Sequence, residues 1–382
     1  MEMVLEFLRD VLSQPALLIG IMSCIGLIAL KRPFHKVMTG TLKPILGYLM
    51  LAAGAGVIVN NLDPLGKMIE HGFHITGVVP NNEAIVAVAQ KVLGVETMSI
   101  LVVGLLMNLC IARFTKFKYV FLTGHHSLFM ACLMSAVLGT AGLSGMELIL
   151  VGGFLMGAWS AISPAIGQSY TSKVTDGDEI AIGHFGSLGY YLSAWVAKYV
   201  GKADDSTEDI EIPEKWGFLR DSTLSTALTM IVFYLIAAFA AGSEFVATLS
   251  GDMSPYLYAV MSAMNFAVGV TIVYSGVRMI LGDLIPAFQG IATKIIPNAI
   301  PAVDCAVFFT YAPTAVVLGF ISSFIGGIIG MLILGAVGGV LIIPGLVPHF
   351  FCGATAGIYG NATGGRRGAA VGAFLNGLAI TF

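Results

Sequence analysis

The stretch PAVDCAVFF, residues 301–309, places a carboxylate inside an apolar run. Asp304 has only small or hydrophobic residues beside it in this stretch. A charged side chain at the centre of a spanning helix costs about 2.5–3.5 kcal/mol on insertion scales, so such residues usually face a partner, a water-filled cavity or a bound polar ligand. The stretch therefore predicts a polar site buried within a membrane protein.

The composition of the whole chain points to the same class. Hydrophobic residues make up 57% of the 382 residues and charged residues 11%, whereas charged residues are about 25% of soluble domains. Apolar stretches long enough to cross a bilayer recur along the sequence, and the 47 glycines suit close helix packing. We expect an all-α integral membrane protein with about ten transmembrane helices. The expected spans are 14–30, 41–59, 95–112, 119–138, 146–163, 223–242, 257–275, 316–341, 344–360 and 367 to the end.

The distribution of basic residues predicts the orientation of the chain. Lys and Arg occur in the segments 31–43, 113–118, 278–294 and 366–367, whereas the segments 139–145 and 243–256 contain neither. Cytoplasmic loops of membrane proteins carry an excess of Lys and Arg. The pattern therefore predicts a multi-pass protein of the bacterial inner membrane with its N-terminus outside.

Two segments with the same pattern indicate an internal repeat. VVPNNEAI (78–85) and NAIPAVDC (298–305) each place a proline shortly before an acidic residue that opens a short apolar stretch. Glu83 and Asp304 are 221 residues apart, and His125 and His349 are 224 residues apart. With five spans in each half, the second copy must insert with the opposite orientation, as in transporters built from inverted repeats.

This repeat predicts the domain organisation. Residues 1–200 form the first repeat and residues 223–382 the second. The segment 201–222 contains the acidic run GKADDSTED (201–209), and we expect a solvated cytoplasmic linker there.

Two further segments, 81–93 and 303–314, are too short to cross the membrane alone. We expect each to be a half-helix or a re-entrant hairpin, so that the Glu83 and Asp304 side chains face one cavity from opposite sides.

The buried polar residues are the candidates for ligand binding. A carboxylate such as Asp304 can accept hydrogen bonds from the vicinal hydroxyls of a sugar-like ligand. The motifs TGHH (123–126) and IGHFG (182–186) supply imidazoles that donate and accept near neutral pH. In the first motif we favour His125 over His126. For every candidate a purely structural hydrogen bond is the alternative. The predicted substrate-binding set is Asp304, His125, His184, Glu83, Asn82, Gly54 and His349.

Other chemistry lacks support in the sequence. No HExxH, GxSxG or Walker motif occurs, so neither proteolysis nor ATP hydrolysis is indicated. The five cysteines lie in apolar segments without CxxC spacing, which is typical of free buried thiols. We expect no catalytic residue, metal, cofactor or nucleic-acid partner.

Several motifs, which occur in a consistent order along the chain, resemble those of the ascorbate-type membrane component (IIC) of the bacterial phosphoenolpyruvate-dependent sugar phosphotransferase system. The similarity extends over nearly the whole sequence. The motifs are TGH (123–125), VTDG (174–177), IGH (182–184), DCA (304–306) and IIPG (342–345).

This resemblance implies a homodimeric carrier in the lipid bilayer that translocates an ascorbate-like sugar or sugar acid by elevator-type alternating access. Cytoplasmic IIA and IIB partners would carry the phosphoryl chemistry, so whether the chain itself counts as an enzyme stays open. The family's substrate contacts would fall on His125, His184 and Asp304. The alternative from the residues alone is a proton-coupled secondary transporter of a small polar solute, with Asp304 or Glu83 as the proton carrier.

The sequence also departs from this family. Phe185 and Phe129 stand where glutamines are usual, Ala55 replaces a serine in an Ala-Gly-Ser-Gly turn, and Glu83 stands where an aromatic residue is common. Because a site built for a hydroxyl rejects ligands that lack it, these changes predict an altered choice among sugars and sugar acids. Relatives continue beyond the apolar run that ends at Phe382, so we expect either a truncated chain or a naturally short member of the family.

Overall fold

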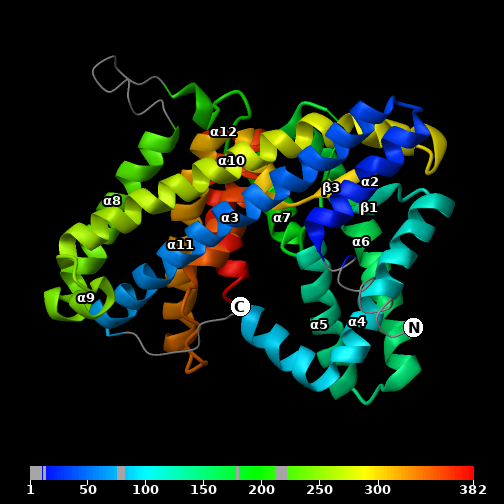
Figure 1. Ribbon diagram of the computed structural model, residues 1–382. Helices are drawn as coiled ribbons and strands as arrows, with labels where there is room; N and C mark the ends of the chain where they lie inside the picture. Colours follow the sequence, from blue (N-terminus) through cyan, green and yellow to red (C-terminus); the bar gives the residue numbers. More distant parts are fainter. Residues whose placement is uncertain (1–10, 12–13, 75–81, 178–179, 211–221) are drawn as a thin grey trace. The chain divides into compact units, whose positions relative to one another are not determined.

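The computed structural model describes residues 11–382 except 12–13, 75–81, 178–179 and 211–221. Helices dominate the described part, and three short strands lie between them (Figure 1). The helices are α2 (Pro15–Ala29), α3 (Phe34–Gly72), α4 (Asn82–Phe114), α5 (Gly124–Thr140), α6 (Gly145–Thr175), α7 (Ser187–Val200), α8 (Ser222–Ala241), α9 (Ser243–Ser250), α10 (Pro255–Lys294), α11 (Pro313–Ala336) and α12 (Leu346–Ala379), with 3-10 turns η1 (Thr207–Asp209) and η3 (Cys305–Thr310); the strands are β1 (Tyr119–Phe121), β2 (Ala181–Ile182) and β3 (Ile300–Val303).

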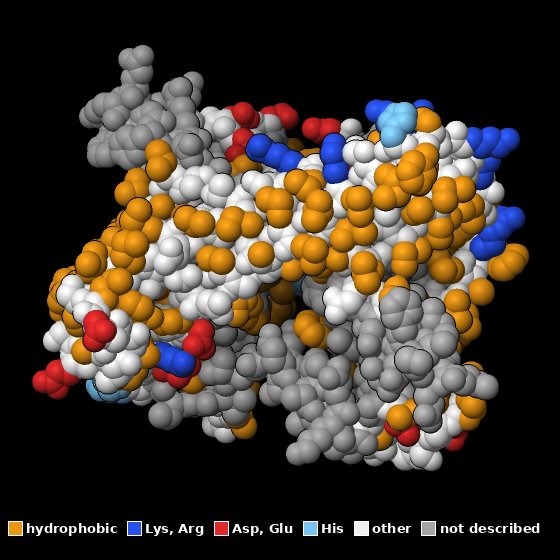
Figure 2. Space-filling view, viewed as in Figure 1, with side chains coloured by type: hydrophobic (Ala, Val, Ile, Leu, Met, Phe, Trp, Pro, Cys, Tyr) orange, Lys and Arg blue, Asp and Glu red, His pale blue; other side chains and the backbone are white. Residues whose placement is uncertain are grey.

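The predicted all-α membrane class is confirmed. Among the described residues, five helices are long and apolar enough to cross a membrane, or six if α8 and the sharply bent α9 form one span. Large apolar side chains lie exposed along one face of α3 and of α10, where a soluble protein would carry polar ones (Figure 2). The count of ten spans stays a prediction. These exposed side chains include Leu42, Leu46, Leu49, Leu257, Met261, Met264 and Val268.

The chain forms two compact units, and each unit combines segments from both halves of the sequence. The first contains residues 1–49, 81–188 and 277–307, and the second contains residues 50–80, 189–276 and 308–382. Helices α3 and α10 therefore contribute residues to both units. The predicted division into inverted repeats stays a prediction.

In the first unit, α4, α5 and α6 pack around a core of aliphatic side chains that includes Ile100, Ala131 and Met156. Small residues bring the helices close together: a Cβ on Gly157 of α6 would lie 2.7 Å from the carbonyl oxygen of Gly104 in α4. The hydroxyls of Thr97 and Ser135 are hydrogen-bonded at 2.7 Å between α4 and α5. Both devices are typical of helices that associate within lipid.

The three strands of the first unit form a small parallel sheet in the order β1-β3-β2. Phe121 pairs with Ala302, and Ile182 pairs with Val303. Residues 119–121 form β1 and α5 begins at Gly124, so the first residues of the predicted span 119–138 are a strand and not part of the helix. The segment 303–314 contains the last residue of β3, the turn η3 and the start of α11, and its predicted re-entrant character stays a prediction. Residues 82–114 form two helical stretches that meet at a kink at Leu93, where the backbone is non-helical, and the predicted re-entrant segment 81–93 stays a prediction.

In the second unit, glycines bring α11 and α12 into direct backbone contact. A Cβ on Gly319 would lie 2.5 Å from the Gly353 carbonyl oxygen and 2.9 Å from the Gly357 Cα. Helix α12 breaks at Gly364 and Gly365, where Gly365 has a φ of 59° that favours glycine.

Residues 201–210 also belong to the second unit, where the acidic run contacts a helix; the predicted cytoplasmic linker stays a prediction. The Glu208 carboxylate accepts hydrogen bonds from the backbone N–H groups of Thr314 and Ala315 at 3.1 Å each, which caps the start of α11. The Asn361 side chain accepts from the backbone N–H of Thr207 at 2.8 Å. The Glu208 carboxylate thus supplies the acceptor that the first N–H groups of α11 lack within the helix.

A glycine pair also marks the crossing of α3 and α10 within the second unit. A Cβ on Gly54 would lie 2.7 Å from the carbonyl oxygen of Gly269 and 2.8 Å from the backbone nitrogen of Val273. Gly56, two residues further along α3, is exposed and has no atom within 4 Å of the corresponding position. Gly54, at the crossing, and Gly56, away from it, therefore offer matched positions on α3 for the same substitution.

We expect Gly54→Ala to lower stability by about 1–3 kcal/mol, because the new methyl group overlaps backbone atoms that cannot rotate away. Gly56→Ala should leave the stability unchanged or raise it by up to ~1 kcal/mol through helix propensity. Thermal unfolding of the detergent-purified variants measures both effects. Equal melting temperatures for the two variants would show that the crossing tolerates a side chain.

Candidate functional site

The carboxyl ends of the three parallel strands bring together residues that are far apart in sequence. β1 leads into Leu122 and Thr123, β2 into Gly183 and His184, and β3 into Asp304. The N–H of Leu122 donates to the Ala302 carbonyl at 2.9 Å, and the N–H of Gly183 donates to the Val303 carbonyl at 2.7 Å. The register therefore continues one residue past β1 and β2, so Asp304 emerges between the other two chain segments.

Asp304 is held in place by the turn that follows it. Its side chain is buried, with 8% exposed, and Oδ1 accepts a hydrogen bond from the Ala306 N–H at 2.9 Å. The phenol of Tyr48, from α3 in the same unit, interacts electrostatically with this carboxyl group. A carboxylate can accept several hydrogen bonds at once, so the Asp304 carboxyl group is a fixed acceptor at the end of the central strand.

The imidazole rings of His126 and His184 lie next to each other. Their ring centroids are 4.0 Å apart, in an edge-to-face arrangement at 61°. The Nδ1 atom of His184 accepts a hydrogen bond from the Gly186 N–H at 2.9 Å. A neutral imidazole that accepts at Nδ1 carries its proton on Nε2, so this contact assigns His184 a donor at Nε2.

Two phenylalanine rings lie beside the imidazole of His126. The ring centroid of His126 lies 5.6 Å from that of Phe185 and 6.0 Å from that of Phe129, both edge to face. These are the positions at which the resemblance led us to expect glutamines. The polar groups of this site therefore stand beside an aromatic wall.

Two buried hydroxyls, which the sequence did not single out, lie on the segments that follow β1 and β2. Thr123 and Ser187 are 1% and 0% exposed, and neither hydroxyl has a hydrogen-bond partner among the described residues. A Cβ on Gly183 would lie 3.0 Å from Thr123 Oγ1 and 2.7 Å from the Ala302 carbonyl oxygen, so the chain segments after the strands converge tightly. The only signal in the sequence was the place of each hydroxyl beside a Gly-His motif. We call Thr123, His126, His184, Ser187 and Asp304 the strand-end cluster.

The structure places the other predicted site residues as follows. His125 lies in the first turn of α5, and Asn82 and Glu83 open α4, but their side chains fall outside the described part. Gly54 lies at the crossing of α3 and α10. His349 belongs to the second unit, where its Nδ1 atom is hydrogen-bonded to the Ser323 hydroxyl at 2.9 Å between α12 and α11. A role of these residues in binding stays a prediction.

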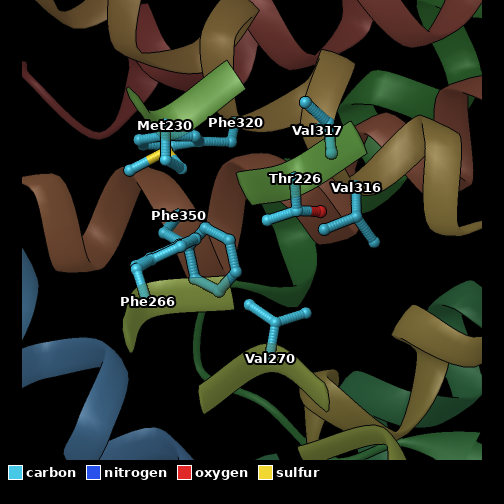
Figure 3. A pocket seen from close by; sticks show the side chains of 8 residues that line it. All are labelled: Thr226, Met230, Phe266, Val270, Val316, Val317, Phe320 and Phe350. Atoms are coloured by element: carbon cyan, nitrogen blue, oxygen red, sulfur yellow. The ribbon is translucent and has the colours of Figure 1, made fainter. Parts of the chain in front are cut away.

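The second unit also contains a small pocket, which is almost entirely apolar (Figure 3). The Thr226 hydroxyl is the one polar side-chain group among the residues that line it. Such a lining offers little to a ligand rich in hydroxyls. The strand-end cluster in the first unit is therefore the better candidate for a polar substrate. The pocket is lined by Thr226, Met230, Phe266, Val270, Val316, Val317, Phe320 and Phe350.

Comparisons with known proteins agree with this architecture. Residues 10–382 match the family described as the PTS system sugar-specific permease component (EIIC-GAT). The chain is also similar to the ascorbate-specific PTS system EIIC component of Mycoplasma pneumoniae, with 28% identity over 424 aligned positions. That alignment covers 95% of this chain and 63% of the relative's length. The match to the family extends over nearly the whole sequence and confirms the resemblance seen in the motifs. The chain belongs to the family of PTS sugar-specific permease components.

Proposed function

We propose that this protein is the membrane carrier (IIC) of a phosphotransferase system and that it binds an ascorbate-like sugar or sugar acid at the strand-end cluster. The observation that carries the proposal is the convergence of a carboxylate, two imidazoles and two buried hydroxyls at the ends of three strands. The family match and the ascorbate-specific Mycoplasma relative support the substrate class.

The chemistry of the cluster suits a ligand with several hydroxyls. Asp304 accepts hydrogen bonds from substrate hydroxyls, and His184 donates from Nε2 to a substrate oxygen. The Thr123 and Ser187 hydroxyls can both donate and accept, so they adapt to either kind of partner. The rings of Phe129 and Phe185 contact the less polar face of the substrate.

The carrier itself supplies binding and translocation in this proposal. The substrate enters from outside, is moved by elevator-type alternating access, and is presented to a phosphorylated cytoplasmic IIB protein that a IIA protein recharges. The protein acts as a homodimer in the bacterial inner membrane with its N-terminus outside. The phosphoryl group is transferred by the partner, and the carrier positions the acceptor hydroxyl.

Uptake by membrane vesicles tests this function. Labelled ascorbate should accumulate only when phosphoenolpyruvate and the cytoplasmic phosphotransferase proteins are supplied, and it should be recovered in phosphorylated form. A pH gradient alone should drive no uptake. Accumulation of unmodified ascorbate in response to the gradient, without the partners, would favour a proton-coupled secondary transporter instead.

Replacing Asp304 tests the predicted acceptor. We expect Asp304→Asn to weaken ascorbate binding by about 10- to 100-fold, because a hydrogen bond to a charged group is worth ~1.5–3 kcal/mol. Ligand-dependent stabilisation of the purified protein in a thermal-shift assay gives the affinity. The matched control is Asp283→Asn, because Asp283 lies in the same unit and its carboxylate is 3.7 Å from the Lys43 ammonium. Wild-type affinity in Asp304→Asn would remove the residue from the site.

The aromatic wall gives a prediction about specificity. Phe185→Gln introduces an amide beside His126 and is expected to raise the affinity for ascorbate relative to other sugars several-fold, since one added hydrogen bond contributes ~1 kcal/mol. A panel of sugars and sugar acids compared with wild type by the same thermal-shift assay measures the change. Phe114→Gln is the control, because Phe114 is 81% exposed at the end of α4. An unchanged ranking of ligands in Phe185→Gln would show that the Phe185 ring does not select the substrate.

A further inference from the structure

The sheet that carries the strand-end cluster has two outer edges, on β1 and on β2, because β3 lies between them. In a parallel ladder, backbone groups point alternately toward one neighbouring strand and the other. The Lys118 carbonyl and the Leu122 N–H bond to β3. The carbonyl of Tyr119 and the N–H of Phe121 therefore point away from β3, toward the outer edge.

The side chain of Asn108, from α4, meets this outer edge of β1. Its Nδ2 donates to the Tyr119 carbonyl at 3.0 Å, and its Oδ1 accepts from the Phe121 N–H at 3.0 Å. One amide thus makes the two hydrogen bonds that a backbone residue of a neighbouring parallel strand would make. Asn108 is 2% exposed, so water does not substitute for it.

Gln168, from α6, lies at the other outer edge. Its Nε2 donates to the Ile180 carbonyl at 3.2 Å. Ile180 and Ile182 have the same relation to β2 as Tyr119 and Phe121 have to β1, because the Gly183 N–H bonds to β3. The Oε1 atom of Gln168 is buried and has no donor among the described residues. The Gln168 amide therefore makes one of the two edge hydrogen bonds that Asn108 makes at β1.

These contacts matter because of where the sheet lies. It is packed among α4 and α6, two helices with membrane-spanning character, and an unpaired backbone group in such surroundings costs more than it does at a wet surface. An open edge would favour slippage, and a shift by one residue reverses the direction of every side chain. Thr123 and His126 follow β1, and His184 follows β2, so the position of these side chains depends on the register of the strands.

We infer that Asn108 and Gln168 are positioning residues whose side-chain amides replace the missing outer strands and hold the strand-end cluster in register. Asn108 secures the segment that leads to Thr123 and His126, and Gln168 secures the segment that leads to His184. The effect on ligand binding rests on the proposed function, whereas the closing of the strand edges does not.

The experiment compares Asn108→Leu with wild type in two measurements. Hydrogen–deuterium exchange over residues 119–126 should accelerate by about tenfold or more, since the Phe121 N–H loses its acceptor and the segment beyond it loosens. The ascorbate KM for transport should rise by about tenfold, while the maximal rate per folded protein changes much less. A purely structural role would lower the amount of folded protein and leave KM and the local exchange as in wild type.

Asn61→Leu is the matched control, because the Asn61 amide also lies within a membrane-spanning helix but donates only to its own helix, at the Val57 carbonyl 2.7 Å away. It should leave the exchange over residues 119–126 and the KM unchanged. Gln168→Leu should accelerate exchange over residues 180–186, by less than Asn108→Leu does at β1. If Asn108→Leu fails to fold, Asn108→Ser, which keeps a single hydroxyl, should give an intermediate acceleration.

The two possible failures can be told apart. If the wild-type protein binds no ascorbate, the proposed substrate is wrong and the exchange data alone decide the role of the amides. If ascorbate binds but Asn108→Leu keeps wild-type exchange over residues 119–126 and a wild-type KM, the positioning role is refuted.

Discussion

The pairing of backbone hydrogen-bonding groups away from water is the constraint on which this structure depends. Helices meet that requirement within one segment, but strands need neighbours. The first unit nevertheless contains a three-stranded sheet, and each strand is only two to four residues long. Such strands persist because β3 pairs on both sides and side-chain amides from α4 and α6 supply bonds at the outer edges. In return, the end of the sheet offers a place where polar side chains gather inside an apolar protein.

The association of the helices depends on a second feature, the close packing of small residues. Backbone atoms meet directly where glycines face each other, at Gly54 and Gly269 and again at Gly319 and Gly357. In lipid, dispersion contacts and a few hydrogen bonds must hold helices together, because burial of apolar surface from water contributes little there. The glycines thus allow close helix contact at these crossings without interhelical hydrogen bonds from polar side chains.

Much of this could be predicted from the sequence, because composition and hydropathy report directly on lipid exposure. Asp304 and His184 could also be singled out, since an ionisable residue in an apolar run needs a reason to be there. The strands could not be predicted in the same way: YVF and IPAV are too short and too apolar to differ from parts of a spanning helix. The choice between His125 and His126 also depends on side-chain directions, which motif spacing does not contain. The contact between Glu208 and the start of α11 could not be predicted either, because the two lie more than a hundred residues apart in sequence.

The order of the strands has a consequence for how the protein is made. β3 is the central strand of the sheet but the last to be synthesised, since β2 ends at residue 182 and β3 begins at residue 300. While the intervening chain is inserted into the membrane, β1 and β2 have no partner between them. Contacts of such long range form late and slowly. The strand-end cluster can therefore be completed only after residues 300–304 have been synthesised, because β1 and β2 pair with β3 and not with each other.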